Sequence, residues 1–132
     1  MQDFQNYILG SWGKGEGIET NLYNAINGDA LGGVSSAGID YEAVLDYGRK
    51  VGGPALRKMT FQERGRMLKA LAFYLLERKS SYYKISAWTG ATKIDSWIDI
   101  EGGIGNLFAN ASLRKQFPDL PYYVDGVAAP LS

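Results

Sequence analysis

The sequence predicts an α/β chain with a β-rich arm over residues 1–38, about four helices over residues 39–117 and an extended tail over residues 118–132. Three observations support this prediction. Eight glycines divide residues 1–38 into short segments separated by turns. From Asp40 onward, apolar residues recur at the spacing of a helix face. Thr60-Phe61-Gln62-Glu63 has the pattern of a capping box, in which two side chains satisfy free amides at a helix start.

The arm contains three candidate extended segments: Asn6 to Trp12, Gly17 to Ile26, and Leu31 to Ser35. The last two flank a predicted turn at Asn27-Gly28-Asp29. Two or three short strands have too little surface to form a stable sheet alone. We therefore expect the arm to lie on the helices or on a sheet elsewhere.

The first two helices are predicted from caps and apolar faces. The first begins at Asp40 and is expected to stop at Gly52-Gly53-Pro54, because proline breaks helix interiors. The second begins after Thr60, with Phe73 and Tyr74 opposite its apolar face, so we expect it to be covered on both sides. That apolar face consists of Phe61, Leu68, Leu71, Ala72, Leu75 and Leu76.

Two more helices follow, one around Ser80 to Trp88 and one from about Lys93 to Leu113. The last helix is predicted to be amphipathic. Its expected apolar stripe consists of Ile94, Trp97, Ile98, Ile104, Gly105, Phe108 and Ala111. The tail holds three prolines and several apolar residues, and we expect it to lead into a remainder that this sequence lacks.

The absence of cysteine and histidine from the 132 residues excludes several chemistries. The chain has no thiolate nucleophile, no imidazole base and no ligands for a zinc site. Its longest apolar run, Ala70 to Leu76, is far shorter than the roughly 20 residues of a membrane span. The start of the sequence does not resemble a secretory signal, so we expect a cytoplasmic protein without a membrane segment.

The formal net charge of zero conceals a strong asymmetry. Residues 49–93 hold 11 of the 14 basic side chains against Glu63 and Glu77, a net charge of +9. Residues 1–48 carry −6 and residues 94–132 carry −3. We expect these parts to attract one another or other subunits, and not nucleic acid, because no nucleic-acid motif accompanies the basic stretch.

Gly102-Gly103-Ile104-Gly105 lies inside a predicted helix and therefore lacks the strand-to-helix context of a phosphate-binding loop. Each interior glycine costs about 1 kcal/mol relative to alanine. We therefore expect these glycines to mark close packing on both faces of the helix.

Glu101 falls within the predicted apolar stripe, where an unpaired carboxylate would be costly. We expect it to pair with an arginine or lysine of residues 57–69 or with backbone amides. The functional alternative is an acid with a raised pKa at a cleft.

Two longer runs carry a family resemblance. They are Gly53-Pro54-Ala55-Leu56-Arg57-x-Met59-Thr60-Phe61-x-Glu63-Arg64 and Thr89-Gly90-Ala91-Thr92-x-x-Asp95-Ser96-Trp97-x-Asp99-Ile100-Glu101-Gly102-Gly103-Ile104-Gly105. With the β-rich arm before them, they resemble the N-terminal segment of the aldehyde dehydrogenase superfamily, and within it the bifunctional enzymes of phenylacetic acid degradation.

The resemblance implies a larger NADP-dependent enzyme that oxidises a CoA-thioester semialdehyde and also carries an oxepin-CoA hydrolase domain. The family's cysteine nucleophile, glutamate base and nicotinamide-binding unit would lie beyond residue 132, so we assign no catalytic, cofactor-binding or metal-binding residue here. No cofactor is expected to bind this chain alone. The segment would form part of the outer shell of the coenzyme-binding domain, with Trp97, Ile100 and Ile104 as candidate walls of the substrate tunnel.

The resemblance also implies partners, namely the remainder of the dehydrogenase and other subunits of a homo-oligomer. The alternative is an independent helical interaction module without enzymatic activity. In both interpretations, Phe73 and Tyr74 require another protein surface that packs against them.

Overall fold

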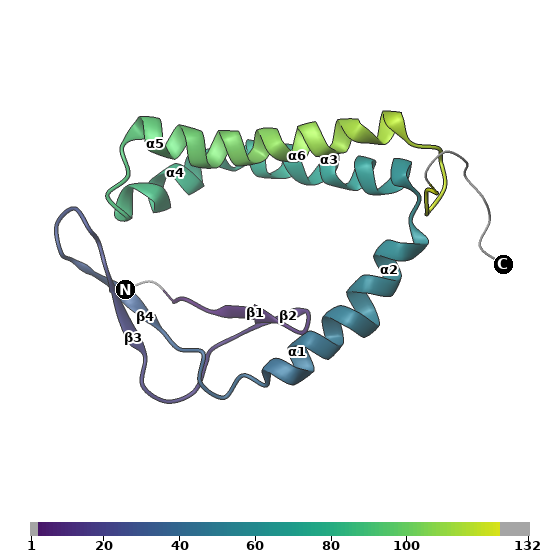
Figure 1. Cartoon of the computed structure of the whole chain (residues 1–132). Coiled ribbons are helices and arrows are strands. Elements are labelled where there is room, and N and C mark those ends of the chain that lie inside the picture. The colour runs from purple at the N-terminus through teal and green to yellow at the C-terminus, as the bar shows by residue number, and fades with distance from the viewer. Residues whose placement is uncertain (1–2, 125–132) are drawn as a thin grey trace.

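The computed structural model describes residues 3–124 and contains two small β-hairpins followed by a series of helices. In Figure 1 the longest helices form an antiparallel pair along the top, α1 and α2 lie at the lower right, and the hairpins lie at the lower left. The predicted α/β class is confirmed. Residues 125–132, which make up most of the predicted tail, lie outside the described part of the chain.

The first hairpin pairs β1 (Asn6–Ile8) with β2 (Ser11–Gly13). The prediction of one extended segment from Asn6 to Trp12 is therefore wrong. Leu9 and Gly10 have φ values of 51° and 82°, and positive φ at both central residues is the geometry of a tight hairpin turn. The turn brings the rings of Tyr7 and Trp12 to a centroid distance of 5.0 Å.

The second hairpin pairs β3 (Thr20–Tyr23) with β4 (Ala30–Val34) around the predicted turn. Gly28, at φ 77°, donates its N–H to the Asn24 carbonyl at 2.8 Å. In the same turn, the residue after Asn24 contacts a helix: the Ala25 N–H donates to the Trp88 carbonyl at 2.8 Å. The arm thus contacts the helices, as expected, and its four strands form two separate sheets.

The first helical stretch runs from α1 (Tyr41–Tyr47) through a π-helical turn, η1 (Gly48–Gly52), into α2 (Gly53–Lys58). The predicted stop at Gly52-Gly53-Pro54 is wrong. The N–H of Gly53 bonds to the Gly48 carbonyl, five residues back, so the chain is more widely wound directly before Pro54. The proline then occupies the first turn of α2, where its missing N–H costs little.

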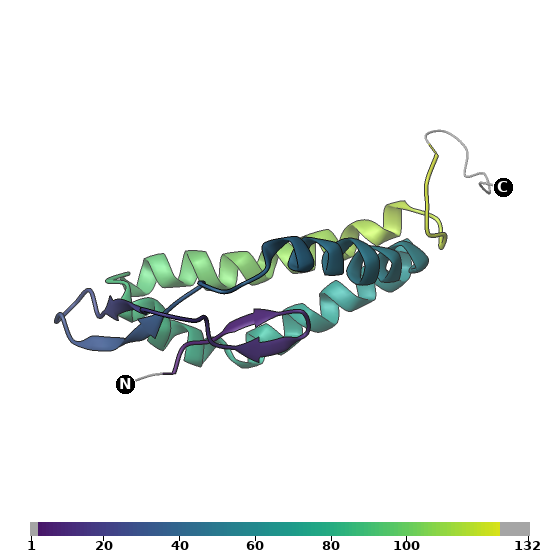
Figure 2. The same ribbon diagram turned by 90° about the horizontal axis from the view of Figure 1, so that it is seen from below.

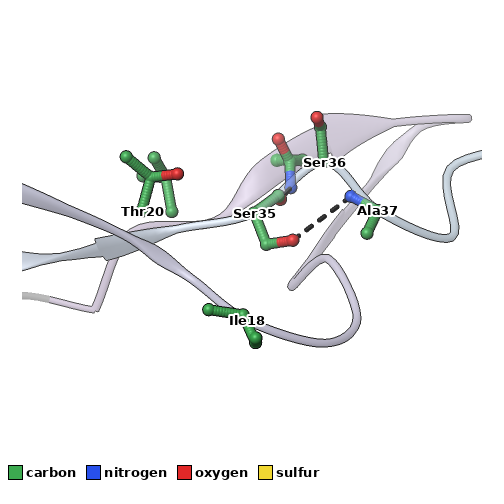
Figure 3. Close-up of a pocket in the computed structure, with 7 residues that line it drawn as sticks. Ile18, Thr20, Ser35, Ser36 and Ala37 are labelled. Carbon is green, nitrogen blue, oxygen red and sulfur yellow. Dashed lines mark hydrogen bonds between the residues drawn. The ribbon is translucent and has the colours of Figure 1, made fainter.

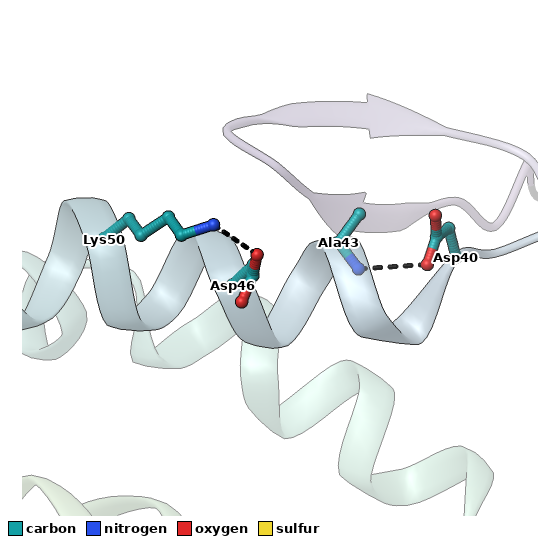
Figure 4. Close-up of polar contacts among 4 residues, drawn as sticks. All are labelled: Asp40, Ala43, Asp46 and Lys50. Atoms are coloured by element: carbon teal, nitrogen blue, oxygen red, sulfur yellow. Dashed lines mark hydrogen bonds and ion pairs between the residues drawn. The ribbon is translucent and has the colours of Figure 1, made fainter.

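Two polar contacts on this stretch are exposed and connect residues of the same stretch (Figure 4). The Asp40 carboxylate accepts a hydrogen bond from the Ala43 N–H at 3.0 Å and caps α1. Near the end of α1, Asp46 accepts a hydrogen bond at 2.5 Å from Lys50 of η1, four residues later. These local contacts stabilise the helix itself and contribute little to packing.

The helical pair consists of α3 (Phe61–Glu77) and α6 (Gly103–Ser112). The predicted capping box is present, with the Glu63 carboxylate 2.8 Å from the Thr60 nitrogen. Most of the predicted apolar face of α3 is buried or half-buried, but Leu71 is 45% exposed. Within the described residues, the buried apolar side chains are Ala72, Ile104 and Ala111.

The last helical stretch follows α4 (Lys79–Trp88) and comprises α5 (Lys93–Trp97), η2 (Ile98–Gly102), α6 and η3 (Leu113–Gln116). The predicted stripe is wrong up to the start of η2, because Ile94, Trp97 and Ile98 are each more than half exposed. After η2, Gly105 is exposed as well. The extra residue of the π-helical turn η2 rotates the buried face by about 100°. Consequently Ser96 is the buried residue of α5.

The predicted glycine packing is also wrong within the described residues. Apart from the adjacent residues and the backbone of its own helix, a Cβ atom added to Gly102, Gly103 or Gly105 would meet no atom within 4 Å. The glycine at the helix crossing is Gly65 of α3, where an added Cβ would lie 2.5 Å from the Arg114 Cδ atom and 3.0 Å from the Ala111 carbonyl oxygen. Close approach of α3 and α6 therefore depends on Gly65.

The segment after η3 folds back over the start of α3. The rings of Phe61 and Phe117 stack at a centroid distance of 4.5 Å, and the Phe61 N–H donates to the Leu120 carbonyl at 3.0 Å. The Gln62 amide donates to the carbonyls of Arg114 at 2.8 Å and Phe117 at 3.3 Å. A side chain of α3 thus satisfies carbonyls at the end of the last helix. Seen from below in Figure 2, this segment leaves the same end of the helical pair at which α2 meets α3.

Candidate functional site

An apolar groove runs between α3, α4 and the last helix. It has a volume of about 360 Å³. Its lining residues are Leu75, Tyr82, Ile100, Gly103, Ile104 and Leu107. We call this concavity the helical groove. A predominantly apolar concavity of this size is typical of a ligand site or of a surface that receives another element.

The structure places two of the three candidate tunnel residues together. Ile100 and Ile104 both line the helical groove, and Ile104 is only 5% exposed. Trp97 does not line it and is 57% exposed. The π-helical turn separates them, because Trp97 precedes it and Ile104 follows it. The assignment of all three to a tunnel wall remains a prediction.

Glu101 lies beside this groove and has different partners from those expected. Its carboxylate accepts hydrogen bonds from the Lys79 ammonium at 3.1 Å and the Tyr83 hydroxyl at 2.8 Å. The expected partner in residues 57–69 is therefore wrong. Within helix α4, Lys79 and Tyr83 are four residues apart and lie on one face.

Both partners of the Glu101 carboxylate are hydrogen-bond donors, which favour its charged form. Hydrogen bonding from Lys79, and then from Tyr83, holds the pKa of Glu101 below its ordinary value. Partial desolvation, followed by the bond to the Glu101 anion, raises the pKa of Tyr83. The alternative of a raised-pKa acid is therefore wrong, and Glu101 joins η2 to α4 as an anion.

A hydrogen-bonded serine pair joins α4 to α5, with Ser96 buried and Ser86 half-buried, and sequence reasoning missed it. The Ser96 hydroxyl donates to the Thr92 carbonyl at 2.9 Å, which leaves the Ser86 hydroxyl to donate to Ser96 at 2.8 Å. Ser96 is only 2% exposed. Helix periodicity that includes the π-helical turn would have placed Ser96 on the inner face.

A second capping box, also missed, starts α5 at Thr92. The Asp95 carboxylate lies 3.1 Å from the Thr92 nitrogen, and its bonds to the Thr92 hydroxyl and backbone lower the pKa of Asp95. The pattern Thr92-x-x-Asp95 was visible in the sequence. The Asp95 carboxylate is therefore engaged in capping the N-terminus of α5.

Another concavity, of about 380 Å³, lies in the arm (Figure 3). Ser35 organises its wall, because its hydroxyl donates to the Glu16 carbonyl at 2.7 Å and accepts from the Ala37 N–H at 3.2 Å. Ile18 lines the same concavity but is 96% exposed. The polar groups of the wall thus bond mainly to the arm itself.

Residues 3–124 contain no cluster of three or more acidic side chains that could hold a metal ion. In the same part of the chain, no helix has the length and apolar character needed to cross a bilayer. Because the sequence contains no cysteine or histidine, neither the helical groove nor the concavity in the arm contains a nucleophile paired with an imidazole base. The helical groove can bury the apolar surface of a ligand or of another element. The polar side chains beside it, Glu101, Lys79 and Tyr83, join η2 to α4.

No protein-family model matches the sequence. Comparison with curated proteins nevertheless supports a relationship with the aldehyde dehydrogenases, which are oxidoreductases. One similar protein is a 3,4-dehydroadipyl-CoA semialdehyde dehydrogenase from Aromatoleum evansii, 39% identical over 111 residues. Those residues are 83% of this chain and 22% of the relative, so the chain spans less than a quarter of the length of the relative.

Proposed function

We propose that the chain is an N-terminal structural part of an NADP-dependent aldehyde dehydrogenase that oxidises a CoA-thioester semialdehyde. The observation that carries this proposal is the 39% identity to a CoA-semialdehyde dehydrogenase over most of this chain. The two motif runs, which resemble the phenylacetic acid degradation bifunctional protein PaaZ, point to phenylacetate catabolism and to a parent that also carries an oxepin-CoA hydrolase domain.

In this proposal the chain has a structural role in the enzyme and contributes no reacting group. It has no cysteine for the nucleophile that this class of enzyme uses. Its motif residues are engaged in folding, since Thr60 and Thr92 cap helices and Glu101 is paired with Lys79. NADP binding and catalysis would reside in other regions of a cytoplasmic, homo-oligomeric parent, and Trp97, Ile100 and Ile104 would lie near its substrate tunnel.

A chimera tests the proposal. The matching N-terminal region of the Aromatoleum evansii relative is replaced by this chain, and NADPH formation is followed with a CoA-semialdehyde substrate. We expect the chimera to retain activity, while the 132-residue chain alone produces no NADPH. A chimera that folds and assembles but is inactive would contradict the proposal, as would NADPH formation by the chain alone.

The second candidate is an independent helical interaction module. Exposed aromatic side chains favour it, since Phe73, Tyr74 and Trp97 are each about half exposed. In a dehydrogenase the same side chains would meet the remainder of the enzyme or another subunit. Sedimentation of the purified chain at micromolar concentration separates the candidates. Self-association with binding of a dye specific for apolar surface supports the dehydrogenase part, and a clean monomer without dye binding supports the module.

A further inference from the structure

Two arginine side chains line one cavity at the end of the helical pair where α3 begins. The cavity has a volume of about 240 Å³. It is lined by Phe61, Arg64, Gly65, Leu68, Asn110, Leu113, Arg114 and Phe117. We call it the arginine cavity. Its lining includes Arg64 and Arg114, the amide residue Asn110 and a set of apolar residues, and it contains no aspartate or glutamate.

The first guanidinium is held in place by its surroundings. The Arg64 Cζ atom lies 4.5 Å from the centroid of the Phe61 ring. Arg64 also donates to the Leu56 carbonyl at 3.3 Å and the Pro121 carbonyl at 3.2 Å. A guanidinium carries five N–H groups, so these two bonds leave donors for a ligand.

The second guanidinium is held from the opposite helix. Arg114 donates to the Ala111 carbonyl, and its aliphatic stem packs where Gly65 lacks a side chain. Within residues 3–124, neither Arg64 nor Arg114 forms an ion pair with a carboxylate. The cavity therefore combines two positioned cations with no internal anion.

We propose that the arginine cavity binds a small carboxylate with an apolar body, such as hexanoate. The planar guanidinium matches a carboxylate geometrically, and bonds between charged groups are about twice as strong as neutral ones. The side chains of Leu68, Leu113 and Phe117 provide apolar walls for the hydrocarbon part. An apolar cavity of about 150 Å³ holds benzene, so this cavity accommodates a body of six carbons.

This site is separate from the helical groove and does not depend on the proposed function. The arginine cavity lies beside the start of α3, whereas the helical groove contains Leu75 near its end. Inorganic phosphate would satisfy the cations but leave the apolar walls exposed to water. The combination of charge and apolar surface therefore favours a carboxylate with a hydrocarbon body over a bare anion.

Isothermal titration of the 132-residue chain tests this proposal with three probes: hexanoate, its neutral isostere hexanamide, and inorganic phosphate. We expect hexanoate to bind at least about tenfold more tightly than either of the others, because only hexanoate uses both features. Equal affinity for hexanamide would overturn the role of the arginines, and equal affinity for phosphate would overturn the role of the walls. Absence of hexanoate binding at millimolar concentration would overturn the whole proposal.

Variants locate the site. Arg114→Gln should weaken hexanoate binding by about tenfold. Asn110→Asp, which places a carboxylate in the cavity wall and leaves both arginines intact, should also weaken it. The matched controls are Asn106→Asp, one helical turn earlier in α6, and Lys84→Gln in α4, which follows the other end of α3. Both should retain the wild-type affinity. If folded Asn110→Asp binds as wild type does, or if Asn106→Asp weakens binding equally, the assignment is wrong.

Discussion

Replacing Gly65 with alanine tests the close approach of α3 and α6. The new Cβ would lie 2.5 Å from the Arg114 Cδ, 2.9 Å from its Cβ and 3.0 Å from the Ala111 carbonyl oxygen. The Cδ belongs to a flexible side chain and can move. The other two atoms move only with the backbone of the last helix, so Gly65→Ala must displace that helix or distort it.

Two opposing effects set the magnitude. Overpacking of a close contact costs about 1–3 kcal/mol. Alanine in a helix interior gains about 1 kcal/mol over glycine. We therefore expect Gly65→Ala to lower the free energy of unfolding by about 1 kcal/mol. Gly102→Ala is the matched control, because its Cβ would meet no atom of another element within 4 Å. It should raise the free energy of unfolding by up to about 1 kcal/mol.

Urea unfolding followed by circular dichroism at the helix band measures both changes. The test is whether the free energy of unfolding is lower for Gly65→Ala than for Gly102→Ala. If Gly65→Ala stabilises the chain as much as Gly102→Ala does, the two helices are further apart than the structure places them, and the reasoning fails.

Two further predictions concern the contacts of α4. Ser96→Ala should lower the free energy of unfolding by about 1 kcal/mol, because it leaves the Ser86 hydroxyl without its acceptor, and urea unfolding that matches wild type would contradict this. The bond between Glu101 and Lys79 should stabilise the chain fully above the ordinary carboxylate pKa of 4.5 and less as the pH falls through the lower folded-state pKa. Wild type should therefore be more stable than Glu101→Gln at pH 7, with the difference shrinking on acidification. Glu42→Gln, in the first turn of α1, serves as the control, and a difference that is independent of pH would argue against the ion pair.

The helix starts were predictable because their signals are local. Asp40 and Thr60 act on amides within three residues of themselves, so their patterns are complete within a short window. The same rule would have found Thr92. The order of arm and helices follows from such signals together with apolar periodicity.

The π-helical turns were not predictable from periodicity, which assumes a constant number of residues per turn. One extra residue in η2 moved Ser96 to the inner face and left Trp97 exposed. The partner of Glu101 and the role of Gly65 depend on which helices lie side by side. Lys79 is 22 residues from Glu101, and the residues that meet Gly65 are farther along still, so no local pattern identifies them. The arginine cavity likewise requires the pairing of α3 with α6 before Arg64 and Arg114 can be seen together.

The bonds from the Gln62 amide to the carbonyls of Arg114 and Phe117 couple two distant stretches of chain. The start of α3 and the end of the last helix cannot fray independently, because unwinding either one breaks the same pair of bonds and separates the stacked rings of Phe61 and Phe117. Both ends should therefore open in one cooperative step. In native-state hydrogen exchange, the amides of these two ends would share a single opening free energy, although more than 50 residues separate Gln62 from Phe117.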